Sequence, residues 1–589
     1  MGLGILEDRV MDHVPGTTRY FDDPERPQYS RDGVTGLKCD TSGPQPIVLV
    51  PQPSDDPNDP LNWPLWRRDL ITFVLSVTAI FATALGPILA ANTLSLSLFF
   101  RVDIGRVALL TGYFLLGVGF AGCFFVPSSR IWGKRHAFVI GVLILVASSA
   151  WGGACAHPKN YTSFLWSRII QGVGTAPYEA LVNAAVGDLY FVHERGKRMA
   201  FTNLAVFGGA FFTPIVVGKI TEELGWWWSF NFVAIFCAAC VPAVILFCPE
   251  TAYRRDASLN TDMLATEGNV ASDKTPSYSV TAGPSDGTEL RDQSGSDTVA
   301  PVTPEGANGT QAGDPQRVDG QKVHVPGKTS WVKSLSLFNG RKTDENFFKL
   351  FLRPFPLFLQ PAFLWAALIQ GTMIGWTVFI GVILGTSFQT YPLWWNEAKA
   401  GYTYTGAFLG AILGFLISGL LSDWSARKLT RMNKGIYEPE FRIWLVIPQF
   451  IFGVMGLFGW GITVDGMLKK EYHWSVPLVF FGFEVCGMVV GAVASSLYIV
   501  DAYRDLAIEG FTCLIIFKNF FSFALTWRAY AWLIENHTHS KPLFNAIGSV
   551  QIAVCLLSVP MYIFGKRNRS FFYRHDLLKM FGLGHENPH

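Results

Sequence analysis

Four ionisable residues lie inside long apolar stretches of the sequence: Arg168, Glu179, Glu484 and Lys518. A charged side chain at the centre of a bilayer costs at least about 2.5–3.5 kcal/mol on insertion scales, so each one needs a partner, a polar cavity or a function. Carboxylates and amines in such places carry protons or form ion pairs. We therefore expect Glu179, Glu484 and Lys518 to take part in proton coupling.

Arg168 and Glu179 are eleven residues apart, which is almost three helical turns, so they share one helix face while standing about 16 Å apart along the axis. Gln171 and Thr175 lie between them on the same face. One interpretation is a polar stripe that lines a solute path, with Glu179 as a proton or cation acceptor. The alternative is that both charges are bound to neighbouring helices and only fix the packing.

Glu484 and Lys518 lie about ten residues into their apolar stretches, from opposite sides, which places both roughly 15 Å deep. Because they are level, we expect an ion pair between them that breaks or re-forms as protons or solute bind. The alternative is a permanent pair that holds two helices together.

Aromatic and amide side chains inside the stretches are candidates for contacts with a solute. Gln370 and Trp376 flank two glycines that could mark a bend beside a binding site. Rings such as Tyr113, Tyr178 and Trp376 could form a cage for a cation. The predicted cavity residues are Gln171, Thr175, Tyr178, Gln370, Trp376 and Tyr113.

Membrane helices must position these residues, since half of the 589 residues are apolar and only 16% are charged. A helix needs about 20 apolar residues to cross the hydrocarbon core. We therefore predict an all-α polytopic membrane protein with twelve transmembrane helices in two six-helix bundles. The predicted spans are about 70–92, 107–129, 136–156, 164–187, 199–220 and 228–248, then 363–388, 403–421, 443–464, 474–499, 511–533 and 543–565.

A long polar insert rich in Ser, Thr, Gly, Asp and Pro separates the two sets of spans, and we expect it to be largely disordered. The excess of Lys and Arg in alternate loops predicts that both termini and this insert face the cytoplasm. Asn160 and Asn536 begin sequons in the predicted outer loops, where glycosylation is conceivable and chance occurrence is the simpler explanation. The predicted regions are an N-terminal tail (1–68), an N-terminal bundle (69–248), the linker (249–361), a C-terminal bundle (362–565) and a C-terminal tail (566–589).

Two motifs resemble the major facilitator superfamily, and in particular its fungal members. Residues 59–64 read Asp-Pro-Leu-Asn-Trp-Pro, just before the first span, and residues 168–174 read Arg-Ile-Ile-Gln-Gly-Val-Gly in the fourth. Residues 498–519 are similar to a branch that contains drug and organic-cation transporters. The resemblance implies the two-bundle fold and a role for Arg168 in coupling proton movement.

The superfamily's cytoplasmic gate motif is matched twice, both times after a span that enters the cytoplasm. The loop after the second span keeps Gly133, Lys134 and Arg135, but Arg130 stands where the motif has an acid, which argues against the usual ion pair there. The predicted gate residues are Gly133, Lys134, Arg135, Gly419, Asp423, Arg427, Lys428, Asp501 and Arg504.

The resemblance implies a secondary transporter with a small-molecule substrate, driven by protons. Gly209, Pro214 and Gly218 match part of the fifth-helix motif of drug:proton antiporters, which favours export of an amphipathic or cationic organic compound. Proton-coupled uptake of a nutrient such as an organic cation or polyamine, and a non-transporting nutrient sensor, remain alternatives.

No phosphate-binding, zinc-protease or nucleophile-elbow motif is found, and a formal charge of +2 offers no basic field for nucleic acid. We expect no enzyme activity, cofactor, metal or nucleic-acid partner. The expected form is a monomer in the lipid bilayer of the plasma membrane, with the vacuolar membrane as the alternative.

Overall fold

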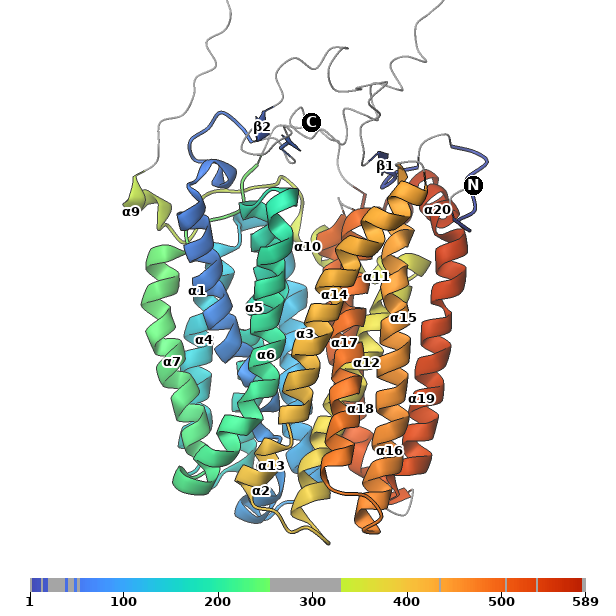
Figure 1. Cartoon of the computed structure of the whole chain (residues 1–589). Coiled ribbons are helices and arrows are strands. Elements are labelled where there is room, and N and C mark those ends of the chain that lie inside the picture. The colour runs from blue at the N-terminus through green and yellow to red at the C-terminus, as the bar shows by residue number, and fades with distance from the viewer. Residues whose placement is uncertain are drawn as a thin grey trace, which may run out of the picture.

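The computed structural model describes residues 3–11, 14–19, 38–40, 47–49, 53–254, 330–433, 436–503, 506–535 and 539–584. Its long helices run roughly parallel in two bundles that stand side by side (Figure 1). We call the end that carries Leu6, Gly133 and Arg569 the terminal face, and the end that carries Asn92, Glu397 and Trp474 the far face. The predicted disorder of the linker falls mostly on residues 255–329, which lie outside the described residues.

The N bundle is built from the first half of the chain. Its first span breaks at Gly86–Pro87, because proline lacks the N–H that would continue the helix. Its elements are α1 (Leu65–Ala84), η2 (Pro87–Leu89), α2 (Thr93–Phe100), α3 (Ile104–Trp132), α4 (Arg135–Ala154), α5 (Tyr161–Leu189), α6 (Val192–Leu224) and α7 (Trp226–Phe247).

The C bundle repeats this plan with the second half of the chain. Its elements are α12 (Pro361–Gln389), α13 (Glu397–Tyr402), α14 (Thr405–Met432), η4 (Pro439–Leu445), α15 (Val446–Gln449), η5 (Phe450–Val454), α16 (Met455–Leu468), α17 (Ser475–Ala502), α18 (Ala507–Glu535), α19 (Ser540–Leu556) and α20 (Ser558–Arg574).

Within the described residues, ten helical segments are long and apolar enough to cross a membrane. The two remaining predicted spans lie on α1 and α5, where Arg67, Arg68 and Asp69, or Arg168 and Glu179, make the helix more polar. Both helices stand among the others in the N bundle (Figure 1). The fold is therefore that of an all-α polytopic membrane protein, as predicted.

Small residues set the closest helix contacts, as is usual in membranes. A Cβ atom at Gly117 would collide with the carbonyl of Ile169, and one at Gly172 with the carbonyl of Phe114. The motif glycine Gly172 thus lets α3 and α5 touch backbone to backbone, which fixes the depth of Arg168 one turn away.

The last part of the predicted linker is folded. It contains α9 (Trp331–Ser334), α10 (Phe347–Leu352) and α11 (Pro354–Leu357), followed directly by α12. Arg353 is fully buried beneath this segment and binds the carboxylate of Glu345 at 2.5 Å. Residues 330–360 therefore belong to the terminal face.

The N-terminal tail reaches across to the C bundle. Its strand β1 (Thr18–Arg19) pairs antiparallel with β4 (Ile436–Tyr437), with Thr18 opposite Tyr437. The amide of Leu6 donates to the carbonyl of Ile563 on α20, and Ile5 and Val14 are buried. The remaining described elements are the antiparallel strands β2 (Cys39–Asp40) and β3 (Ile47–Val48), the 3-10 helix η1 (Pro60–Asn62) and the short helix α21 (Leu577–Met580).

Candidate functional site

Arg168 is fully buried inside the N bundle and is held by backbone carbonyls. Its guanidinium donates to Gln171 Oε1 at 2.7 Å and to the carbonyl of Leu85 at 2.8 Å. The carbonyl of Leu85 is available because α1 ends there, before Pro87. The guanidinium also lies 4.8 Å from the ring centroid of Phe114. Among the described residues Arg168 forms no ion pair. Its charge is stabilised by the amide and carbonyl oxygens that accept its hydrogen bonds and by the ring of Phe114.

The rest of the predicted stripe on α5 binds neighbouring helices. Gln171 donates to the carbonyl of Ser148 on α4 at 3.1 Å, Thr175 to that of Ala82 on α1 at 3.1 Å, and Tyr178 to that of Phe138 at 2.7 Å. All three side chains are buried. These contacts agree with the alternative in which the polar residues of α5 fix the packing of neighbouring helices. Their predicted role in lining a cavity stays a prediction.

Glu179 and Lys518 form an ion pair between the two bundles. The ammonium of Lys518 on α18 contacts the carboxylate of Glu179 on α5, with side-chain exposures of 11% and 16%. One turn of α5 beyond the buried stripe, the carboxylate therefore faces the seam and not the interior of its own bundle. This pair is the charged connection at mid-depth between α5 and α18.

The predicted pair between Glu484 and Lys518 is wrong. Glu484 is fully buried within the C bundle, where Thr377 on α12 donates to its Oε1 at 2.7 Å. Its other oxygen has no hydrogen-bond partner among the described residues, and no described cation pairs with it. The depth of both residues was inferred from spacing, but Glu484 points toward α12 and Lys518 toward α5.

The predicted cavity residues of the second half occupy two environments. Trp376 donates to Gln551 Oε1 at 3.1 Å, and Gln370 Oε1 accepts from Ser495 at 3.2 Å, both within the C bundle. Tyr113 instead lies at the seam, with its ring 6.0 Å from that of Phe523 on α18. Of the three, only Tyr113 therefore contacts the opposite bundle through its ring.

The sequence analysis missed three polar residues that organise the C bundle: Thr377, Gln449 and Gln551. Gln551 accepts from Thr372 as well as from Trp376, and Gln449 donates to the carbonyl of Ile369 at 3.0 Å. All three are polar residues inside predicted apolar spans, and this feature of the sequence could have identified them as candidates.

At the terminal face, Arg130 joins the two bundles. It contacts the carboxylate of Glu509 at the start of α18 and lies 3.8 Å from that of Glu345. Glu509 is also 3.6 Å from Arg353, so two arginines and two glutamates form one cluster. The sequence predicted that the usual ion pair is missing at Arg130, because the motif has an acid at that position. In the structure Arg130 of the N bundle instead pairs with Glu509 of the C bundle.

The other predicted gate residues of the N half act within their bundle. Gly133 has a φ of +90°, and a Cβ there would collide with the carboxylate of Glu250. That carboxylate accepts the backbone amides of Lys134 and Arg135 at 2.9 and 3.1 Å, while the Lys134 ammonium binds Asp188 at 2.5 Å. The motif thus ties α3 and α4 to the end of α7.

In the C half, Asp501 is bound by Arg442 at 2.9 Å and by the hydroxyl of Tyr437. Asp423, Arg427 and Lys428 are exposed and make no ion pair among the described residues, although Lys428 lies 4.6 Å from the ring of Trp424. The neighbouring Gly419 has open space around it. Arg504 lies outside the described residues.

The bundles also touch at the far face. Gln389 on α12 donates to the carbonyl of Ala91 at 2.8 Å, Asn396 donates to Glu222 on α6 at 2.6 Å, and Ser95 binds Glu397. Contacts therefore join the bundles at both faces and at mid-depth. The sequon residue Asn160 caps α5 by accepting from the amide of Ser163, and Asn536 lies outside the described residues.

Two parallel bundles that meet around buried charges define a polytopic membrane transporter. Residues 71–505 match the family model described as Major Facilitator Superfamily, and the chain belongs to that superfamily.

Similar proteins come from fungi and cover most of the chain. Protein HOL1 of Saccharomyces cerevisiae is 24% identical over 95% of both chains. The MFS antiporter QDR3 of Candida albicans is 22% identical over 91% of this chain and 82% of its own. The multidrug transporter TPO1_2 of Candida glabrata is 24% identical over 77% of this chain and 67% of its own. The crystal structure of a D-xylose–proton symporter shares the fold, with a TM-score of 0.53, 13% identity, and coverage of 83% and 97%.

Proposed function

We propose that this transporter exports a small amphipathic or cationic organic compound in exchange for protons. The observation that carries the proposal is the ion pair between Glu179 and Lys518, which connects the bundles through one carboxylate. A proton on Glu179 removes its charge and with it the attraction to Lys518. An organic cation competes with Lys518 for the same carboxylate. A group that binds either a proton or a cation is what exchange requires.

Three further points support this proposal. Two similar proteins carry the words antiporter and multidrug transporter in their names. Arg168 places a second buried charge on the same helix, where it remains a candidate for coupling. Lys and Arg are concentrated at the terminal face, which we assign to the cytoplasm of a plasma-membrane protein.

The test is flux through the purified full chain in sealed proteoliposomes, with a pool of fluorescent organic cations and an imposed proton gradient. We expect saturable movement of a cation against the direction of the protons, and its loss in Glu179→Gln. Glu223→Gln is the matched control, because Glu223 is a solvent-exposed partner of Lys219 at the far-face end of α6, away from the mid-depth pair of Glu179 and Lys518.

Two results would overturn the proposal. Movement of solute in the same direction as protons would establish uptake in place of export. Saturable binding with no flux in any gradient would establish a sensor that keeps the transporter fold.

A further inference from the structure

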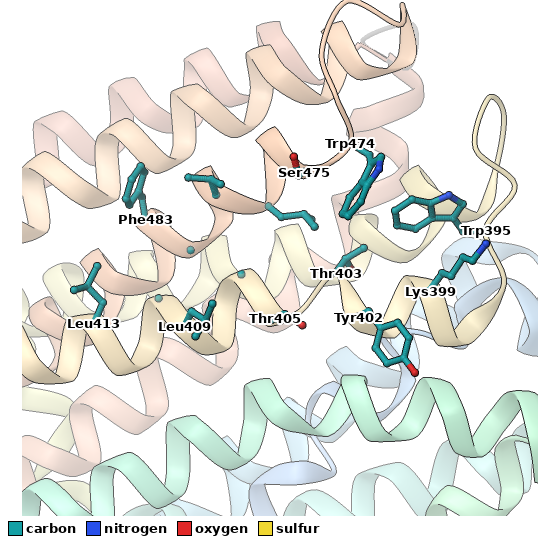
Figure 2. A pocket seen from close by; sticks show the side chains of 15 residues that line it. Trp395, Lys399, Tyr402, Thr403, Thr405, Leu409, Leu413, Trp474, Ser475 and Phe483 are labelled. Atoms are coloured by element: carbon teal, nitrogen blue, oxygen red, sulfur yellow. The ribbon is translucent and has the colours of Figure 1, made fainter.

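A groove of about 940 Å³ opens between α13, α14 and α17 in the half of the C bundle next to the far face. Glycines create it: a Cβ at Gly406 would collide with the carbonyl of Leu478, and one at Gly410 with that of Gly482. The two helix backbones touch along this line, and the larger side chains stand on either side of it. Figure 2 shows Trp395 and Trp474 at one end and Leu413 and Phe483 at the other.

The groove changes from polar to apolar along its length. Lys399, Thr403, Thr405 and Ser475 line the end near the far face, whereas Leu409, Leu413, Leu478, Val479 and Phe483 line the deep end. From Thr405 to Leu413 the helix rises about 12 Å. One leaflet of a hydrocarbon core about 30 Å thick is about 15 Å deep. The groove therefore has the length and polarity of an amphiphile that occupies one leaflet.

Lys399 supplies the charge at the polar end. It is exposed, and among the described residues its ammonium has no ion pair. The carboxylate of Glu397, two residues away, is bound by Ser95 of the N bundle. The rings of Trp395 and Trp474 lie 5.2 Å apart beside it, at the level where tryptophans mark the membrane interface. A basic residue at this level attracts the phosphate of a lipid headgroup.

We propose that this groove is a binding site for one phospholipid of the leaflet at the far face. The lipid phosphate binds the ammonium of Lys399, and one acyl chain lies in the groove over the contact between α14 and α17, against Leu413 and Val479. The site is separate from the seam residues Glu179 and Lys518 and does not depend on which solute the protein moves.

Native mass spectrometry of the full chain tests this proposal, with phosphatidylcholine and diacylglycerol, which has no phosphate, titrated into delipidated protein. We expect one phosphatidylcholine to be retained per chain, in preference to diacylglycerol. Lys399→Glu reverses the charge at the polar end, and Leu413→Trp or Val479→Trp fills the apolar end. We expect each to weaken retention at least fivefold.

Matched controls come from the same surfaces. Lys541 is another exposed lysine near the far face, and Leu416 is 53% exposed on α14 but does not line the groove. Lys541→Glu and Leu416→Trp should retain the lipid as the parent does. Equal retention in all variants would overturn the site. Displacement of the lipid by glycerol phosphate alone, or by an organic cation from the flux pool, would also overturn it, because the acyl chain would then not hold the ligand.

Discussion

The ammonium of Lys518 on α18 contacts the carboxylate of Glu179 on α5, so, within the part of the chain that the structure describes, a charge of each bundle is neutralised by the other bundle. Any motion that separates α5 from α18 must break this contact or move a proton or cation into it. Conversely, a ligand that discharges Glu179 weakens the closed arrangement. The seam thus contains a contact through which ligand charge and bundle separation are linked.

Removing one partner of this pair should destabilise the protein more than removing both. Leaving one buried charge without its partner lowers the free energy of unfolding by about 3–5 kcal/mol, whereas replacing both charges by uncharged side chains of similar size often changes it little. We expect Glu179→Gln and Lys518→Met each to lower the thermal unfolding midpoint in detergent, and the double variant to recover most of the loss. Additive losses would show that the two side chains do not interact.

Reversing the charges of Arg130 and Glu509 tests the contact at the terminal face. Arg130→Glu places an acid beside Glu509 and Glu345, and Glu509→Arg places a base beside Arg130 and Arg353. We expect each single variant to lower flux, because it replaces an attraction between the two bundles with a repulsion. The double reversal should regain flux, and failure to exceed the single variants would exclude direct pairing.

Glu484 is expected to tolerate neutralisation. Its carboxylate lies in a protein interior without a cation, where a charge is costly, and an amide keeps the bond from Thr377. Glu484→Gln should therefore unfold within about 1 kcal/mol of the parent, whereas Thr377→Val, which leaves the buried group unsatisfied, should cost about 1–3 kcal/mol. Chemical denaturation in mixed micelles measures both, and a severely destabilised Glu484→Gln would reveal an unseen cationic partner.

The N-terminal tail should resist proteolysis only while it is docked. Gly16 has a φ of +88°, and a Cβ there would lie 3.1 Å from the carbonyl of Asp501. Gly16→Ala should therefore release the tail and speed its cleavage by a protease added to the detergent-solubilised protein. Val10→Ala is the control, because Val10 is 64% exposed. Equal cleavage rates in the two variants would contradict the docked geometry.

Acid should loosen the same tail. Burial acts to raise the pKa of Asp8, but the bond from the Ser570 hydroxyl and bonds from backbone amides outweigh it and leave the pKa below its ordinary value. A carboxyl with a lowered pKa contributes to docking above its free-chain pKa, near 3.9, and loses that contribution as the pH falls through the lowered value. Tail cleavage should rise below about pH 4 in the parent, and Asp8→Asn should flatten this dependence.

Apolar run length and motif spacing were enough to predict the all-α polytopic fold, because the thickness of the membrane fixes the length of a spanning helix. They also predicted a depth for Glu484 and Lys518, since each residue adds a constant rise. They could not give the direction in which a side chain points, because nearly uniform apolar faces carry little rotational signal. That is why Lys518 was assigned to Glu484 and not to Glu179.

At the predicted gate, too, the sequence identified a residue but not its partner. The sequence located Arg130 as a departure from the family motif, but its partner Glu509 lies 379 residues away on a helix of the other bundle. Only the packing of α3 on α18 brings the two together. The tail contacts were likewise invisible, because residues 3–19 carry no periodic apolar pattern that predicts a docking site.

The docked tail has a consequence for the order of synthesis. The carbonyl of Leu3 accepts from the hydroxyl of Tyr562, which lies 559 residues later in the chain, so the tail leaves the ribosome long before its partner. At 5–20 residues per second, the tail waits roughly 30 to 110 s for its partner to be made. During that time the apolar side chains of Ile5 and Val14 stay exposed to solvent, and they remain exposed in a chain whose synthesis stops early. The docking of the tail therefore depends on α20, and exposed Ile5 and Val14 would mark a chain that lacks this helix.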